Sequence, residues 1–230
     1  MLLGDVSISS CFFPGFKGRI RERNTALKMR NSNETITSIE RESIRLVKAF
    51  LEDDKNAFDQ LILLRKSMVF NLCYRFLGNY EDADDCAQDV FLKVFHSLKK
   101  FRFESNFTTW LYRITVNTCK NKLNSLDYRR RFKKMRINNN KPKDDSPQSV
   151  EVGDETYSPE SSLKRKEISQ IIQEAVNKLP KPQKMVVVLR DMEGRSYEEI
   201  VEITGFKLGT VKSKLSRARQ ELRETLRGSV

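Results

Sequence analysis

Histidine is almost absent from this chain, since His96 is the single one among 230 residues. The four cysteines, Cys11, Cys73, Cys86 and Cys119, include no closely spaced pair. Metal sites in proteins need thiolates and imidazoles that converge from short spacings, so the sequence predicts no metal site and no cofactor. We expect the cysteines to be small apolar residues on helices in a reducing cytosol.

Long apolar runs are missing as well. No stretch approaches the ~20 apolar residues that are needed to cross a bilayer. The first residues carry Asp5 early and have no basic start, which is unlike a secretory signal. These absences predict a cytoplasmic protein without membrane insertion.

Catalytic patterns are also lacking. There is no glycine-rich phosphate loop of the G-x-x-x-x-G-K type, and a lone histidine such as His96 is more often a packed or surface residue than a base. Acidic residues between 82 and 89 could bind magnesium in principle, but a docking surface or a capped helix is the better interpretation. The sequence therefore predicts a protein that is not an enzyme.

Positive charge is abundant. Lys and Arg total 43 against 31 Asp and Glu, which gives a net charge of +12. Charged residues make up 32% and hydrophobic residues 38%, a balance that suits small helical domains better than a large enzyme core. The excess favours a polyanionic partner, although many basic proteins bind no nucleic acid.

The apolar periodicity predicts an all-α protein with two small helical domains joined by a flexible linker. The first domain, residues 36–126, is expected to hold four helices. A capping box at Thr37–Glu40 is expected to open the first helix, and Gly78 followed by Asn79 to end the second. The third is expected to begin in the acidic run 81–85 and the fourth near Phe107.

Three further segments complete the chain. Residues 1–35 are assigned no function and are expected to be a disordered tail. Translation could also start at Met29, in which case the residues before it are not part of the protein. Residues 127–160 have too little apolar surface to offset their ordering entropy, which predicts a flexible tether. Residues 161–230 form the second domain. Its three consecutive valines at 186–188 could form a strand, but the helical patterns on both sides favour a buried helix.

The second domain contains a helix-turn-helix pattern. Ser196 and Glu199 form a capping box, and Gly205 supplies a turn in which positive φ is favourable. Val201 and Val211 flank this turn at the spacing that packs two helices together. No acidic residue lies between positions 207 and 220, where the cations are Lys207, Lys212, Lys214, Arg217 and Arg219. The pattern predicts a helix for the DNA major groove, and the alternative is a helical hairpin with a solvated basic face.

Aromatic residues alternate with cations between positions 101 and 123. Single-stranded bases stack on aromatic faces while cations hold the backbone. Phe101, Phe103 and Asn106 lie before the predicted helix and are expected to be accessible to DNA. Trp110 repeats with Ile114 at helical spacing and is expected to lie in the core.

Three motifs occur in order: 82–95, 101–114 and the helix-turn-helix. In this order they resemble extracytoplasmic-function (ECF) sigma factors of the sigma-70 superfamily, over about residues 38–125 and 162–226. The resemblance implies a sigma-2-like four-helix domain and a sigma-4-like domain. It also implies a subunit that directs promoter-specific transcription initiation with core RNA polymerase, through the β′ and β subunits. The implied partners are promoter DNA and an anti-sigma factor, which could hold the protein at the inner membrane.

The resemblance also implies site residues. Polymerase docking is expected at Asp82, Asp85, Gln88, Asp89 and Phe91. Recognition of the minus-ten element is expected at Phe101, Arg102, Phe103, Asn106, Asn117 and Lys120. Recognition of the minus-thirty-five element is expected at Thr210, Lys212, Ser213, Lys214, Ser216, Arg217 and Arg219, with the two arginines on phosphates.

Two positions depart from the family pattern. Phe103 stands where glycine is common, and Cys86 where a larger aliphatic residue is usual. The competing interpretation is a stand-alone helix-turn-helix regulator with a sensing bundle, which would bind duplex DNA without polymerase. The first two motifs argue against it, because a sensor domain has no reason to carry them.

Overall fold

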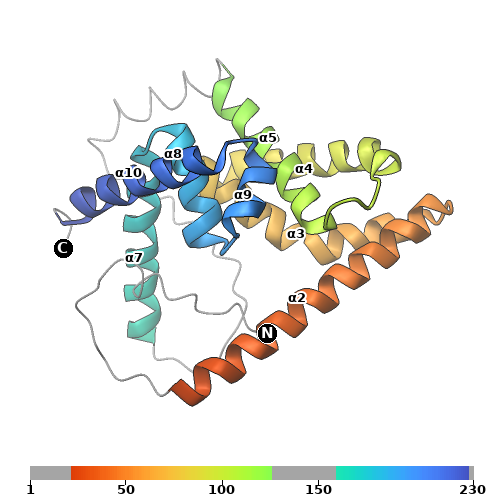
Figure 1. Ribbon diagram of the computed structural model, residues 1–230, viewed down its shortest axis with the longest axis horizontal. Helices are drawn as coiled ribbons and strands as arrows, with labels where there is room; N and C mark the ends of the chain where they lie inside the picture. Colours follow the sequence, from red (N-terminus) through yellow and green to blue (C-terminus); the bar gives the residue numbers. More distant parts are fainter. Residues whose placement is uncertain (1–21, 126–158, 228–230) are drawn as a thin grey trace.

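The computed structural model describes residues 22–125 and 159–227, with side chains described for 37–125 and 168–227. Every regular element in these ranges is helical, so the all-α prediction is confirmed (Figure 1). The elements are α2 (Glu22–Leu51), α3 (Lys55–Leu77), α4 (Tyr80–Ser97), η1 (Leu98–Lys100), α5 (Phe107–Asn124), α7 (Pro159–Lys178), α8 (Lys181–Val187), η2 (Val188–Met192), α9 (Tyr197–Thr204) and α10 (Leu208–Arg227). Residues 1–21 and most of the predicted linker lie outside the described residues.

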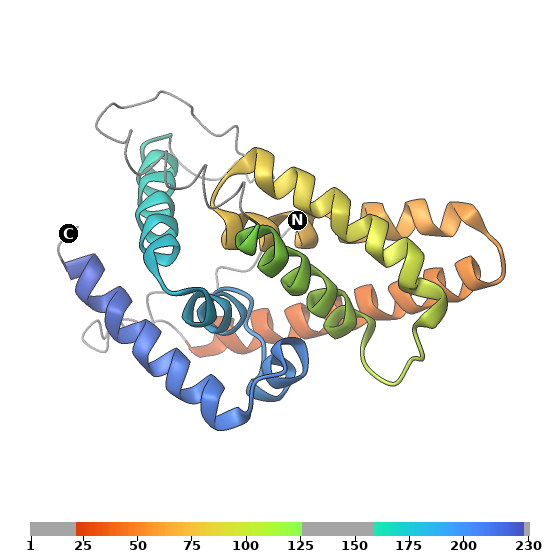
Figure 2. The same cartoon turned by 90° about the horizontal axis from the view of Figure 1, so that it is seen from above.

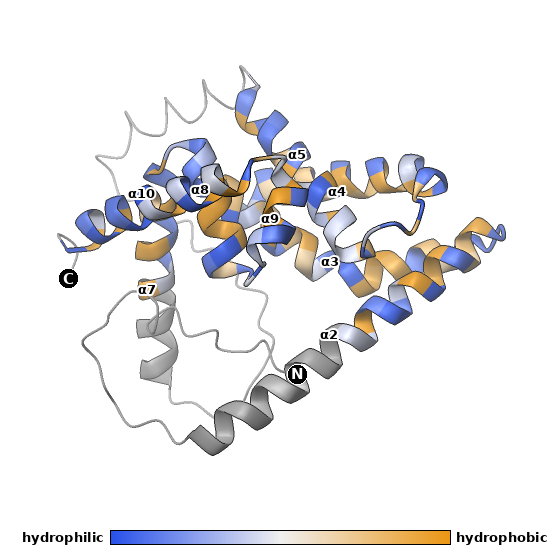
Figure 3. Ribbon diagram, in the orientation of Figure 1, coloured by the Kyte–Doolittle hydropathy of each residue, from blue (hydrophilic) through white to orange (hydrophobic). Residues whose placement is uncertain are grey.

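The first bundle consists of α2, α3, α4 and α5. Apolar and polar residues alternate around these helices, as an amphipathic bundle requires (Figure 3). Its core includes Leu46, Val47, Phe58, Leu61, Val69, Leu72, Phe76, Val90, Val94, Leu98, Phe107, Leu111 and Tyr112. Trp110 is 8% exposed, which confirms its predicted place in the core.

Local capping residues set the helix ends in this bundle. The Asp54 carboxylate accepts a hydrogen bond from the Asn56 amide at 3.0 Å at the start of α3. Gly78 ends α3 with a φ of 74°, and the Asn79 side chain accepts from the Asp82 amide at 2.9 Å to start α4. The predicted boundary at Gly78 is confirmed, because glycine adopts this left-handed conformation without a Cβ clash.

The predicted start of the first helix is wrong. α2 begins at Glu22 and passes through Thr37 without a break, so part of the expected tail is helical. Glu40 does not close a capping box. Its carboxylate accepts from the backbone amide of Thr108 at 3.2 Å and from Arg65 at 3.1 Å. A long-range contact to α5 therefore uses the side chain that the local pattern assigned to a cap.

The second bundle consists of α7, α8, η2, α9 and α10. Val186, Val187, Val188 and Leu189 are almost completely buried in α8 and in the π-helical turn η2 that follows it. The valines are thus helical rather than extended. Burial of this run explains why a β-branched segment forms a helix, since tertiary packing outweighs local propensity.

The two bundles pack against each other, with α9 beside α5 (Figures 1 and 2). Glu193, at the end of η2, accepts hydrogen bonds from Arg75 on α3 and from the Tyr112 hydroxyl on α5, the latter at 2.6 Å. Arg195 lies over the Tyr112 ring, 4.7 Å from its centroid. Burial, together with the nearby Glu193 carboxylate, raises the pKa of Tyr112. A polar cluster therefore connects the bundles through a largely desolvated carboxylate.

Candidate nucleic-acid interface

The helix-turn-helix is formed by α9 and α10. The Ser196 hydroxyl accepts from the Glu199 amide at 3.1 Å, and the Glu199 carboxylate accepts from the Ser196 amide at 2.7 Å. Both bonds of the predicted capping box are therefore present. Gly205 ends α9 with a φ of 72°, and its amide donates to the Val201 carbonyl at 2.9 Å. These local bonds fix the angle at which α10 leaves the turn.

One side of α10 packs in the core of the second bundle, and the other side faces solvent. Val211, Leu215, Ala218 and Leu222 are buried at helical spacing. Ser213, Ser216 and Arg217 are exposed on the remaining surface, as is Lys212. The Thr210 side chain is half-buried near the start of the helix. Four of the seven predicted recognition residues, Lys212, Ser213, Ser216 and Arg217, are therefore exposed on the part of α10 that does not face the core.

Arg219 differs from its neighbours on α10. Its guanidinium makes a bidentate pair with Asp191 in η2, with distances of 3.0 Å from Nε to Oδ2 and 2.5 Å from Nη2 to Oδ1. Asp191 is nearly buried, with 7% of its side chain exposed. Arg219 was expected to contact phosphate. The structure gives it a carboxylate partner inside the domain, and such charge-assisted pairs are strong and directional.

Lys214 is also partly withdrawn from solvent. Its ammonium lies 5.5 Å from the centroid of the Phe206 ring, in the turn between α9 and α10. A cation over an aromatic face contributes roughly 0.5–1 kcal/mol at exposed sites. Lys214 therefore links α10 to the turn, in addition to any role toward DNA.

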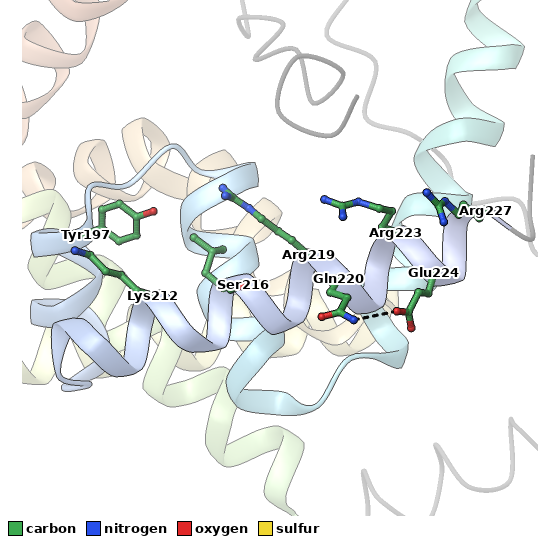
Figure 4. A pocket seen from close by; sticks show the side chains of 9 residues that line it. Tyr197, Lys212, Ser216, Arg219, Gln220, Arg223, Glu224 and Arg227 are labelled. Atoms are coloured by element: carbon green, nitrogen blue, oxygen red, sulfur yellow. Dashed lines mark hydrogen bonds between the residues drawn. The ribbon is translucent and has the colours of Figure 1, made fainter. Parts of the chain in front are cut away.

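A groove runs along one flank of α10 (Figure 4). Lys212, Arg219, Arg223 and Arg227 line it from α10, and Tyr197 lines it from α9. Gln220 and Glu224 are hydrogen-bonded to each other at 3.2 Å on the same helix. The sequence analysis missed Tyr197, Arg223 and Arg227. The four-residue spacing of the arginines at 219, 223 and 227 would have predicted a continuous basic flank.

A second polar face lies on α5. Arg113, Asn117 and Lys120 are exposed and repeat every three or four residues, in line with Asn106 at the start of the helix. Asn106 is exposed, and its side chain makes no capping hydrogen bond. Arg102 is exposed in the preceding loop. Arg113 belongs to this face by its spacing, although the sequence analysis did not select it as a site residue.

Phe101 does not lie on this face. Its side chain is 6% exposed and packs against Phe107 and Trp110, with ring centroids 5.7 Å and 5.1 Å away. The prediction that Phe101 is accessible to DNA is therefore wrong. Burying an aromatic side chain in an aromatic cluster stabilises the loop more than exposure would.

Phe103 is accessible, with 40% of its surface exposed. Its φ of 57° lies in the left-handed region, which bulky residues rarely adopt. Its ring packs against the Phe101 ring with 4.8 Å between centroids and the two planes tilted by 58°, and the Lys48 ammonium lies 6.0 Å from the Phe103 centroid. Glycine adopts this backbone conformation readily, and here a residue with an exposed ring adopts it.

The acidic side of α4 forms a third surface. Asp85, Gln88 and Asp89 are exposed, whereas Asp82 is half-buried and Phe91 packs against the core. Asp85 pairs with Lys122 of α5 at 3.3 Å, and Gln88 donates to Asp84 at 2.9 Å. Leu92 is 60% exposed on the same helix and was missed from the sequence. Leu92 therefore lies on the same face of α4 as Asp85, Gln88 and Asp89.

The three described cysteines are free and buried on helices, as the sequence predicted, but the sequence did not indicate that they lie together. Cys73, Cys86 and Cys119 come from three different helices, yet their sulfurs converge in the core. Sequence spacing alone predicted no convergence, because α3, α4 and α5 bring residues together that lie far apart in the chain.

A helical bundle with an acidic face and a basic polar face, followed by a helix-turn-helix domain, is typical of a two-domain DNA-binding transcription protein. Residues 61–129 match Sigma-70 region 2, and residues 169–222 match Sigma-70, region 4. The chain is 33% identical over 190 residues to the RNA polymerase sigma-H factor of Pseudomonas aeruginosa, covering 79% of this chain and 92% of that protein. It is 34% identical over 182 residues to the ECF RNA polymerase sigma-E factor of Haemophilus influenzae, covering 76% and 90%.

The chain therefore belongs to the sigma-70 family and is an RNA polymerase sigma factor of the ECF type. A solved structure of the sigma factor RpoE with the anti-sigma factor NepR from Bartonella quintana is 26% identical. Its TM-score is 0.52, covering 74% of this chain and 96% of that one. CnrH in complex with the cytosolic domain of CnrY shares the fold, with a TM-score of 0.54 at 21% identity, covering 83% and 98%. In the described residues, no helix is both long and apolar enough to span a membrane.

Proposed function

We propose that this sigma factor directs core RNA polymerase to promoters through three surfaces. The acidic face of α4 docks on the polymerase β′ subunit, through Asp85, Gln88, Asp89 and Leu92. The polar face of α5 and the loop before it bind the minus-ten element, through Arg102, Phe103, Asn106, Asn117 and Lys120. The outward surface of α10 binds the minus-thirty-five element, through Thr210, Lys212, Ser213, Ser216 and Arg217. The observation that carries the proposal is that one helical bundle presents both the acidic face of α4 and the basic polar face of α5.

Phe101 has a supporting role in this scheme. Because it is buried beneath Phe103, it holds the loop rather than stacking on a base. Phe103 is the exposed ring of the pair and is the better candidate for base stacking. Base–aromatic stacking contributes about 1–3 kcal/mol per base.

The energetics require the polymerase. Opening a promoter disrupts base-pair steps that are worth about 1.4 kcal/mol each, so a dozen steps cost on the order of 15 kcal/mol. Stacking one or two unpaired bases on the sigma factor contributes only about 1–3 kcal/mol per base. The sigma factor therefore selects the sequence, and the polymerase supplies most of the contacts that hold the DNA open. We propose no catalytic role for this chain.

We also propose an anti-sigma partner. The support is that the solved structure of the related RpoE contains the anti-sigma factor NepR. The exposed apolar side chains of Tyr80, Leu92 and Phe95 on α4 suit such a protein partner. An anti-sigma factor that covered them would also block polymerase docking.

The test is transcription of genomic DNA fragments by purified core RNA polymerase, with and without the full-length protein. We expect transcripts from discrete start sites only when the protein is added, and their upstream sequences would reveal both promoter elements. If core polymerase neither binds the protein nor initiates, while the protein alone protects a specific duplex, it is a stand-alone regulator.

A matched pair of variants tests the docking face. Leu92→Ser on α4 is expected to weaken binding to core polymerase by about tenfold or more, because burying a leucine at an interface contributes about 1.5–3 kcal/mol. Leu63 on α3 is exposed to a similar extent, 63% against 60%, and Leu63→Ser is expected to bind normally. Equal losses in both variants would contradict the assignment of α4.

A further inference from the structure

Three cysteines meet in the core of the first bundle. Cys73 lies on α3, Cys86 on α4 and Cys119 on α5, and all three are fully buried. The Sγ atom of Cys119 lies 3.7 Å from the Sγ atoms of both Cys73 and Cys86. All three sulfurs lie within 4.8 Å of one another.

The triangle of sulfurs has the size of a metal site. With two sides of 3.7 Å and a third of at most 4.8 Å, the point equidistant from the three sulfurs lies within about 2.1–2.4 Å of each. A metal–thiolate bond is about 2.3 Å long, as in zinc sites. An ion at this point would therefore reach all three ligands without any large movement of the helices.

The number of ligands restricts the metal. In the described residues, no histidine, aspartate or glutamate joins the three sulfurs as a fourth ligand. Structural zinc sites are almost always tetrahedral, with four protein ligands. Soft thiolate ligands select thiophilic ions such as Cu(I). A site with three sulfur ligands and no fourth ligand suits a three-coordinate monovalent ion better than zinc.

Lysine side chains lie near the sulfurs. Lys122 and Lys93 attract negative charge on Cys86, and Lys184 interacts with Cys119. Lys93 is held by the Thr118 hydroxyl at 3.1 Å, next to Cys119, and Lys122 by Asp85 at 3.3 Å. Hydrogen bonds from the neighbouring thiols of Cys119 and Cys73, and then these lysines, lower the pKa of Cys86. The pKa values of Cys73 and Cys119 are raised, first by hydrogen bonds within the cluster and also by burial.

We propose that Cys73, Cys86 and Cys119 form a buried three-thiolate site for a soft monovalent metal ion of the Cu(I) type. Binding joins the metal to three sulfurs and releases the protons that the thiols carry. Each thiol that binds as a thiolate releases its proton to solvent, and one Cu(I) ion with three thiolates has a net charge of −2, near which Lys93 and Lys122 supply positive charge. The bound ion links α3, α4 and α5, and therefore couples the bundle that carries the proposed docking and minus-ten surfaces to a thiophilic metal.

The test is anaerobic titration of the full-length protein with Cu(I), in competition with a chromogenic Cu(I) chelator. We expect one ion per chain and an affinity that rises with pH, because the thiols lose protons when they bind the ion. X-ray absorption should show three sulfur ligands at about 2.2–2.3 Å. Bound Cu(I) should also raise the thermal unfolding temperature, because it binds the folded state.

Variants separate this site from adventitious binding. Cys86→Ala is expected to bind Cu(I) more than about 100-fold more weakly, whereas Cys11→Ala, the control outside the described residues, is expected to bind normally. Nitrogen or oxygen ligands in the absorption spectrum, or unchanged affinity in Cys86→Ala, would overturn the proposal. If Cys86→Ala does not fold, the wild-type spectrum and stoichiometry decide the outcome. A disulfide formed under air with no Cu(I) uptake under anaerobic conditions would show that the cluster is a redox pair instead.

Discussion

Replacing Lys184 with methionine should stabilise the protein at neutral pH. The side chain is 5% exposed, and its ammonium donates a hydrogen bond to Oδ1 of the Asn177 side chain at 2.6 Å. Burial lowers the pKa of Lys184 from 10.5 to about 7. The folded protein therefore binds the Lys184 proton more weakly than the unfolded chain does.

The size of the effect follows from this shift. One pKa unit corresponds to 1.36 kcal/mol, so keeping the charged lysine buried costs about 5 kcal/mol below pH 7. Losing the hydrogen bond to Asn177 costs about 1 kcal/mol. We expect Lys184→Met to be about 2–4 kcal/mol more stable than the wild type at pH 7.

The pH dependence has a definite sign. Between about pH 7 and 10.5 the unfolded chain holds the Lys184 proton and the folded protein does not, so wild-type stability rises with pH. The gain is about 1.4 kcal/mol per pH unit. Below pH 7 Lys184 is protonated in both the folded and the unfolded protein, so the full free-energy cost of burying its charge lowers the stability. The difference between wild type and Lys184→Met should therefore shrink from pH 7 to pH 9.

The assay is urea unfolding of both proteins at several pH values from 6 to 9. Comparing the two proteins cancels the contribution of groups that titrate in this range and do not interact with Lys184. Lys178→Met, at an exposed position on α7, is the control and should change stability by less than about 0.5 kcal/mol. A Lys184→Met protein that is less stable than wild type, with a difference independent of pH, would refute the reasoning.

Three further changes test the packing. Glu193→Ala removes the acceptor shared by Arg75 and Tyr112, and we expect the bundles to separate and the radius of gyration in X-ray scattering to rise; an unchanged radius would contradict this. Ser196→Ala should lower the free energy of unfolding by about 1 kcal/mol in denaturant titration, because the capping box is lost, and a change near zero would be inconsistent with it. Gly78→Ala should destabilise more than Gly194→Ala in thermal unfolding. Both glycines have positive φ, but only at Gly78 would an added Cβ lie 2.2 Å from the Asn177 side chain.

Local patterns in the sequence were sufficient for the helix-turn-helix. The capping box at Ser196 and the turn at Gly205 depend on hydrogen bonds between residues at most four positions apart. The same reasoning correctly predicted the end of α3 at Gly78 and the start of α5 at Phe107. Short-range bonds and backbone sterics do not depend on the rest of the fold, so these features follow from the sequence alone.

The pattern at Thr37 shows the limit of such reasoning. A cap motif predicts a helix start only if the chain before it is not helical, and α2 continues through it from Glu22. Glu40 was assigned to the cap, but it binds Arg65 and Thr108, which lie far along the chain. The competing long-range partners are invisible to a local motif.

The sequence by itself determined the all-α class, the two-domain order and the family, because these rest on periodicity and on long ordered motifs. Only the tertiary structure decided that Phe101 is buried, that Arg219 pairs with Asp191, and that three cysteines from three helices meet at their sulfurs. Each of these facts depends on the distance between residues far apart in the chain. Such distances are set by how whole helices pack, and helix packing depends on the summed burial of many side chains rather than on any one motif.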